Sequence, residues 1–186
     1  MNGNKGHDGA GKAPCLKRDF DRIVDAMPET LPNYHAEKLA YSLGEVTGVR
    51  GVSLENMTND EAVLSIVNSN DRKSTVTGKP ILLVTGVFRV IKNNPNGNLP
   101  FTLEGDPDGG KRDIVACLQR FLRHKLGEKY DLRKADEWKN DAEWLKVKDD
   151  KLFHWNTANG LSQCFAKRAE KAGFPPGHFT FHSLRE

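Results

Sequence analysis

The apolar residues of this chain recur first with the spacing of helices, then with that of strands, and then with that of helices again. Apolar residues three and four apart lie on one side of a helix, whereas alternation over a short stretch places them on one face of a strand. We expect helices over 16–27, 33–46, 111–126, 135–147 and 158–172, a shorter one over 53–60, and a last one after the Pro-Pro-Gly turn at 175–177.

The middle of the chain has the residue types of β-strands. Residues 62–67 alternate loosely, and 80–91 (PILLVTGVFRVI) are dense in Val, Ile, Leu and Phe, with Gly86 marking a candidate bulge. An Asn-rich turn follows, and 98–103 predict a returning strand, whereas 68–79 predict a polar connection. The pattern therefore predicts an α+β fold, mainly α-helical, with a small antiparallel β-sheet.

Composition divides the chain into three parts. Residues 1–14 are rich in Gly, Asn and Lys with almost nothing apolar, which predicts a disordered N-terminal tail. Residues 15–30 predict an N-terminal helix or linker, and 31–186 one domain. A chain of 186 residues is long enough to bury a core.

Charge and cysteine usage narrow the class of protein. The formal charge of +3 permits a phosphate-bearing partner without demanding one. Cys15, Cys117 and Cys164 are widely spaced and form no CxxC pair, so we expect neither a disulfide framework nor a zinc ribbon, but small buried side chains in a reducing compartment. Because no apolar run is long enough to span a bilayer and no signal-peptide core is present, we expect no membrane partner and an intracellular or nuclear location.

Candidate chemistry lies near the end of the chain. His182 and Arg185 are three residues apart, so on a helix both side chains can reach the same anion. The guanidinium fork of arginine matches phosphate oxygens, and histidine exchanges protons near neutral pH. Arg50 follows a Thr-Gly turn and could project from a fixed platform. Taken singly, each of these residues is more often a solvated surface side chain than part of a site.

One lysine is a further candidate. Lys92 lies where the 80–91 strand meets the Asn-rich turn, a position from which its side chain can extend into a groove. Lys73 and Lys79 are competitors for the same role, and lysines at hairpin ends are commonly only solubilising.

Three segments together resemble the catalytic domain of the tyrosine recombinases, the phage-integrase family. Residues 39–54 (LAYSLGEVTGVRGVSL) resemble the family's first arginine box, a helix that ends in Thr-Gly-x-Arg. Residues 88–103 resemble its β-hairpin, in which a lysine precedes a strand similar to Val-Pro-Leu. Residues 158–185 resemble the helix, Ala-Gly turn and His-x-x-Arg box that follow. The resemblance covers about residues 30–186 and keeps the order of the three boxes.

This resemblance implies site-specific DNA recombination or integration through a phosphotyrosyl intermediate. Arg50 and Arg185 would hold the non-bridging oxygens of the scissile phosphate, His182 would assist proton transfer, and Lys92 would protonate the leaving 5′-oxygen. The implied partners are double-stranded DNA and other recombinase subunits, which form a tetramer on DNA in the family. No metal and no cofactor is implied, because the bond energy is kept in the covalent link.

The family's nucleophile is a tyrosine that follows the His-x-x-Arg box, whereas Tyr34, Tyr41 and Tyr130 all precede it. Since the sequence ends at Glu186, we expect a C-terminally truncated catalytic domain that binds DNA without cleaving it. Two alternatives remain. One is a non-catalytic DNA-binding or interaction module that retains the fold, and the other is an unrelated helical protein in which the boxes are accidental.

Overall fold

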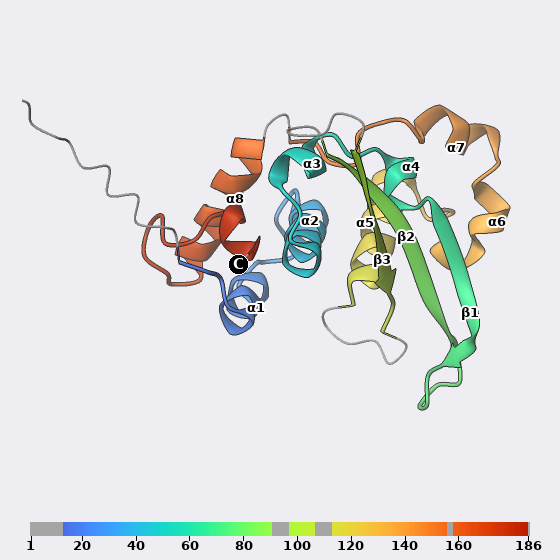
Figure 1. Ribbon diagram of the computed structural model, residues 1–186, viewed down its shortest axis with the longest axis horizontal. Helices are drawn as coiled ribbons and strands as arrows, with labels where there is room; N and C mark the ends of the chain where they lie inside the picture. The colour runs from blue at the N-terminus through green and yellow to red at the C-terminus, as the bar shows by residue number, and fades with distance from the viewer. Residues whose placement is uncertain (1–12, 91–96, 107–112, 156–157, 186) are drawn as a thin grey trace, which may run out of the picture.

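The computed structural model describes residues 13–90, 97–106, 113–155 and 158–185 (Figure 1). Over these residues the fold is α+β and mainly helical, with one small antiparallel sheet, which confirms the class predicted from the apolar pattern. The predicted disordered tail lies almost entirely outside the described residues. In that described part, no helix is both long and apolar enough to cross a bilayer.

The chain enters the fold through α1 (Lys17–Asp25), α2 (Tyr34–Thr47), α3 (Gly51–Glu55) and α4 (Asn59–Ala62). The first two confirm the helices expected over 16–27 and 33–46. The single helix expected over 53–60 is wrong, because Thr58 starts a new one. Its hydroxyl accepts the N–H of Glu61 at 3.3 Å, and the Glu61 carboxylate accepts the N–H of Thr58 at 2.9 Å. This reciprocal capping separates α4 from α3.

The sheet consists of β1 (Ser65–Lys73), β2 (Pro80–Val90) and β3 (Gly97–Glu104), paired antiparallel in the order β1-β2-β3. The first strand is longer than predicted, since it takes in residues 68–73, for which we expected a polar connection. β1 is an edge strand, and most of its side chains are exposed. Polar residues are suited to such an edge, where they have no apolar neighbour to pack against.

Gly86 does not form a bulge. It pairs with Phe101 in regular register, and the ladder irregularity lies instead between Ser69 and Lys73. A Cβ atom at position 86 would lie 2.4 Å from Cζ of Phe101 and 2.6 Å from the carbonyl oxygen of Glu61. Glycine is therefore needed here because α4 and an aromatic ring approach the strand closely.

The C-terminal half contains α5 (Ile114–Leu126), the 3₁₀ turn η1 (Leu132–Lys134), α6 (Ala135–Trp138), α7 (Ala142–Val147), α8 (Ala158–Lys171) and the 3₁₀ helix η2 (Phe181–Arg185). The single helix expected over 135–147 is broken in two. Asp141 caps α7 by accepting the N–H of Trp144 at 2.6 Å, and an N-cap residue has an extended backbone that cannot continue a preceding helix.

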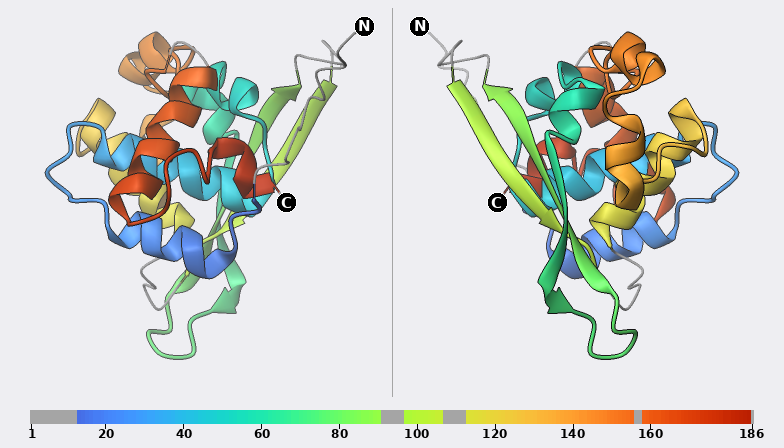
Figure 2. Two further views of the ribbon diagram at one scale, coloured as in Figure 1. Left: turned by 90° about the vertical axis from the view of Figure 1, so that its left-hand side faces the viewer. Right: turned by 90° about the vertical axis from the view of Figure 1, so that its right-hand side faces the viewer.

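α2 lies at the centre of the molecule. It packs against α5, α8 and η2, while α5 contacts β2 and β3. Figure 2 shows the sheet along one side of the helical body. One continuous apolar core joins these elements, so the described residues form a single packed unit.

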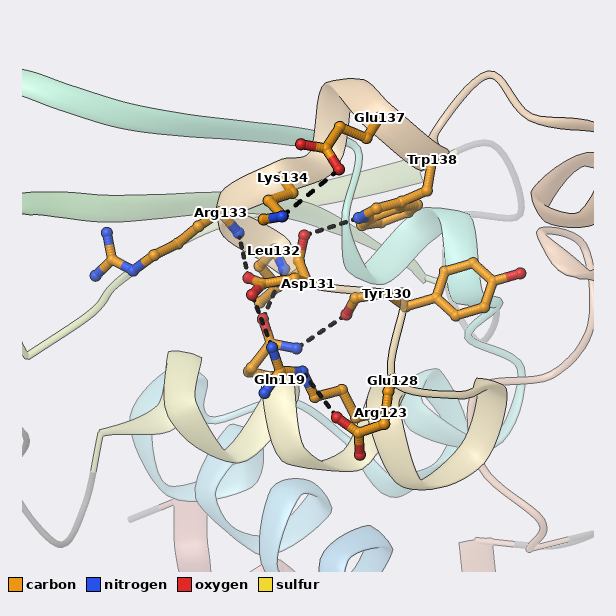
Figure 3. Close-up of polar contacts among 10 residues, drawn as sticks. All are labelled: Gln119, Arg123, Glu128, Tyr130, Asp131, Leu132, Arg133, Lys134, Glu137 and Trp138. Atoms are coloured by element: carbon orange, nitrogen blue, oxygen red, sulfur yellow. Dashed lines mark hydrogen bonds and ion pairs between the residues drawn. The ribbon is translucent and has the colours of Figure 1, made fainter.

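The segment between α5 and α7 is fastened to α5 by a set of polar contacts (Figure 3). The Gln119 side chain donates to the carbonyl of Tyr130 at 2.9 Å and accepts the N–H of Leu132 at 2.6 Å. The indole N–H of Trp138 donates to the carbonyl of Asp131 at 2.7 Å. Trp138 therefore anchors this charged region both by burial and by a hydrogen bond.

Candidate functional site

A rigid turn presents Arg50 at the end of α2. Gly48 ends the helix with φ 62°, in the left-handed region that favours glycine, and its N–H bonds the carbonyl of Gly44 at 2.9 Å. The Thr47 hydroxyl accepts the N–H of Val49 at 3.3 Å. Arg50 follows in an extended conformation and is the N-cap residue of α3. The Thr-Gly-x-Arg signal thus corresponds to a helix end, a fixed turn and an outward arginine.

The Arg50 side chain is exposed, whereas the preceding Val49 is buried. Within the part of the chain that the structure describes, its guanidinium makes no hydrogen bond or ion pair. The donors of this group are therefore free of protein partners there and can bind an external anion.

His182 lies on η2, the second element of the site. Its imidazole is exposed, while Phe181 and Leu184 on either side are buried and hold the helix in place. Arg185 is the last residue of η2, and its side chain lies outside the described part. The final helix predicted from the sequence is a 3₁₀ helix, in which positions three apart lie one above the other. The backbone therefore places positions 182 and 185 on the same side.

Hydrogen bonds of Ser183, a residue of η2, hold this helix in place. The hydroxyl of Ser183 accepts the N–H of Thr180, just before the helix, at 3.2 Å. The carbonyl of Ser183 accepts the N–H of Cys15 at 2.8 Å, which ties η2 to the chain entering α1. Burial raises the pKa of the Cys15 thiol to about 12. This cysteine is thus an inert structural contact and no nucleophile.

Helices α2 and η2 touch at Gly44, one helical turn before the C-cap residue Gly48. A Cβ atom on Gly44 would lie 2.6 Å from Cζ of Phe181 and 3.2 Å from Cδ1 of Leu184. The backbone of α2 at Gly44 therefore lies directly against the Phe181 and Leu184 side chains of η2, although Gly44 and Phe181 are 137 positions apart in sequence. The structure brings together the elements that carry the Arg50 and His182 boxes, and Gly44 is a part of the site that the sequence did not reveal.

Two of the three candidate lysines, Lys73 and Lys79, can be located on the sheet. Lys92 lies outside the described residues. Lys73 and Lys79 are exposed at the turn between β1 and β2, where Lys73 pairs with Pro80. Figure 1 shows the opposite end of β2 beside α3, and an eleven-residue strand is roughly 35 Å long. The two alternatives, Lys73 and Lys79, thus lie at the end of β2 that is far from α3.

All three tyrosines of the sequence are buried. The hydroxyl of Tyr41 donates to Glu37 at 3.1 Å, and that of Tyr34 accepts from Lys38 at 3.1 Å. Burial, and then the Glu37 carboxylate, raise the pKa of Tyr41. Tyr130 packs edge-on against Trp138. Their burial argues against any of them as the nucleophile, in agreement with their position before the His-x-x-Arg box.

Substitution of Gly44 by alanine is expected to displace η2. The added methyl group conflicts with the Phe181 ring, and overpacking of this kind costs about 1–3 kcal/mol, more than the better helix propensity of alanine recovers. Urea unfolding and amide exchange of residues 181–184 measure the effect. Phe181→Leu in the same background removes the conflicting ring atom and should restore part of the stability. An unchanged exchange rate in η2 would show that the contact is not tight.

The exposed guanidinium of Arg50 follows the end of α2, the exposed imidazole of His182 lies on η2, and both are groups suited to an anion. Among the residues described, no cluster of three or more His, Cys, Asp or Glu side chains can hold a metal ion. Comparison of the chain with protein-family models, curated proteins and solved structures gave no match. What the site can do therefore follows from its own residues, an exposed arginine and an exposed histidine.

Proposed function

We propose that this domain binds double-stranded DNA and holds one backbone phosphate between Arg50 and the His182–Arg185 box, as a tyrosine-recombinase-type domain does. The observation that carries the proposal is the close contact of Gly44 with Phe181 and Leu184. It joins the last turn of α2, which leads into the Arg50 turn, to η2, which carries His182. A chance occurrence of the boxes in an unrelated helical protein gives no reason for this juxtaposition.

The chemistry of the site follows from its side chains. A guanidinium presents parallel donors to two phosphate oxygens, and a second arginine at position 185 would neutralise the charge that builds on the phosphorus centre. His182 would move a proton, and Lys92 would be the general acid for the leaving 5′-oxygen. In this proposal the domain works in DNA recombination or integration, with other recombinase subunits as partners.

The second candidate is a DNA-binding module that does not cleave, and the burial of Tyr34, Tyr41 and Tyr130 favours it for this chain taken alone. Cleavage of the recombinase type needs a tyrosine hydroxyl in line with the phosphate. A nicked duplex that traps phosphotyrosyl intermediates separates the two candidates, because only a cleaving protein remains attached to the DNA after denaturation.

Arg50→Ala is expected to weaken duplex binding about tenfold at low salt and to reduce the slope of log K against log salt by about one phosphate contact. Fluorescence anisotropy with a labelled duplex, at several salt concentrations, measures both. Arg50→Lys keeps the charge but loses the bidentate geometry, so its slope should stay close to that of the parent while its affinity falls.

Arg18→Ala is the matched control, because Arg18 is an exposed arginine on α1 with a single surface ion pair to Asp19. It should change neither affinity nor slope appreciably. If the parent protein has no affinity for DNA at low ionic strength, or if Arg50→Ala behaves as Arg18→Ala does, the proposal is wrong.

A further inference from the structure

A cavity of about 510 Å³ lies between the N-terminal end of α2, the C-terminal end of α5 and residues 151–154. Its lining contains three histidines, His35, His124 and His154, and two lysines, Lys125 and Lys151, but no aspartate or glutamate. Its volume is in the usual range for small-molecule sites. Five basic side chains without an acidic one around a cavity are unusual, because like charges repel at short range.

The ammonium group of Lys125 is held at the cavity by neutral acceptors. It donates to Oδ1 of Asn59 at 2.8 Å, to the carbonyl of Leu152 at 3.1 Å, and to the carbonyl of Lys151. Burial lowers the pKa of Lys125 to about 8, and the charge of Asp150 offsets this only in part. Three hydrogen bonds fix the position of this cation, but none of the three acceptors neutralises its charge.

Two imidazoles face each other in the same cavity. The ring centroids of His35 and His124 lie 5.2 Å apart. Burial, followed by the charges of His124, Arg120 and Lys38, lowers the pKa of His35, and Glu29 opposes this shift. Since each protonated ring disfavours protonation of the other, an anion between them would relieve the repulsion.

The rest of the cavity is apolar and aromatic. Phe121 and Phe153 stack with their ring centroids 5.6 Å apart, and Leu152 and Ala36 complete this part of the wall. The first turn of α2 lies at the rim, and the Asn33 side chain makes no capping hydrogen bond there. The partial positive charge of the helix end adds to that of the basic side chains.

We propose that this cavity is a binding site for a small aromatic anion, whose charged group lies at His35, His124 and Lys125 and whose ring lies against Phe121 and Phe153. The site is separate from the proposed phosphate site, because it borders the first turn of α2 and Arg50 follows the last. A helix of 14 residues separates these ends by roughly 20 Å. The inference therefore stands whether or not the domain binds DNA.

Benzenesulfonate is the probe, because its charge stays constant over the pH range in which histidines titrate. Isothermal titration calorimetry should detect its binding to the full chain, and NMR titration should shift the ring signals of His35 and His124. Affinity should increase about fivefold from about pH 8.5 to about pH 5.5, because Lys125, whose pKa burial lowers to about 8, gains positive charge over this interval, and His35, whose pKa burial also lowers, gains it toward the acidic end. Benzyl alcohol, a neutral molecule of similar size, should bind at least tenfold more weakly, and sulfate, which has no ring, should also be weaker.

The double variant H35Q/H124Q should bind benzenesulfonate about tenfold more weakly than the parent, since two charge-assisted contacts are lost. The matched control H178Q/K146Q removes an exposed histidine and an exposed lysine outside the cavity and should leave affinity unchanged. Near-UV circular dichroism checks that both variants are folded, and the wild-type comparison of the three probes is independent of any variant. Equal affinity for benzyl alcohol and benzenesulfonate, or an affinity that is independent of pH, would overturn the proposal.

Discussion

Arg168→Met is expected to reduce the free energy of unfolding by about 3–5 kcal/mol, because it leaves a buried carboxylate without its cation. Nε and Nη2 of Arg168 donate to the two oxygens of Glu37 at 2.6 and 2.8 Å, and the Glu37 side chain is only 3% exposed. Tyr41 donates to the same carboxylate. The bidentate pair joins α2 to α8, so its loss should be visible in urea unfolding of the whole domain.

The double variant Glu37→Leu/Arg168→Met removes both charges and should recover much of this loss, since a buried ion pair and an apolar pair of similar size are often close in stability. Lys171→Met, one turn further along α8 at an exposed position, is the control and should change stability by no more than about 0.5 kcal/mol. If Arg168→Met lowers the free energy of unfolding no more than Lys171→Met does, the ion pair contributes little to stability. Apolar contacts alone would then hold α2 against α8.

Trp138→Ala is expected to lower the free energy of unfolding by about 3–5 kcal/mol, the range for removal of a large buried aromatic side chain. Its indole packs edge-on against Trp144 and Tyr130, with centroids 4.9 and 5.4 Å apart, and donates to the carbonyl of Asp131. The variant would therefore lose apolar burial and leave a carbonyl without its donor. Thermal and urea unfolding measure the total.

Trp138→Phe keeps an aromatic ring but loses the indole N–H, so it should be milder than alanine and show the share that the hydrogen bond contributes. Leu145→Ala provides a control in the neighbouring helix α7. Because this leucine is exposed, its replacement should change the free energy of unfolding by about 0.5 kcal/mol or less. A loss for Trp138→Ala no larger than that for Leu145→Ala would mean that residues 128–147 are not part of the cooperative unit.

The strongest sequence patterns gave the best predictions. The stripe of Leu39, Ala40 and Leu43 placed α2 within one residue of its observed ends, and the run from Pro80 placed β2 equally well. Local side-chain contacts caused the errors. The caps at Thr58 and Asp141 divide apolar stripes that look continuous, because an N-cap is recognised by hydrogen bonds that periodicity does not report.

The other errors arose from contacts between residues that are far apart in sequence, and such contacts also define the candidate site. Gly86 signalled a bulge, and its role is instead to admit Phe101 and α4. Gly44 gave no signal inside its helix, yet it is where η2 meets α2. The paired histidines His35 and His124 are equally invisible in sequence, because they are 89 positions apart and meet only through the packing of α2 on α5.

By itself, the sequence determined the α+β class, the order of the elements and the residues available for phosphate chemistry, because periodicity and residue type are local properties of the chain. Only the tertiary structure decided that α2, which leads into the Arg50 turn, touches η2, which carries His182, that Lys73 and Lys79 are at the far end of the sheet, and that the tyrosines are buried. It also revealed the basic cavity. These results depend on which surfaces pack against one another and exclude water. The packing of the whole core determines this, and no single segment does.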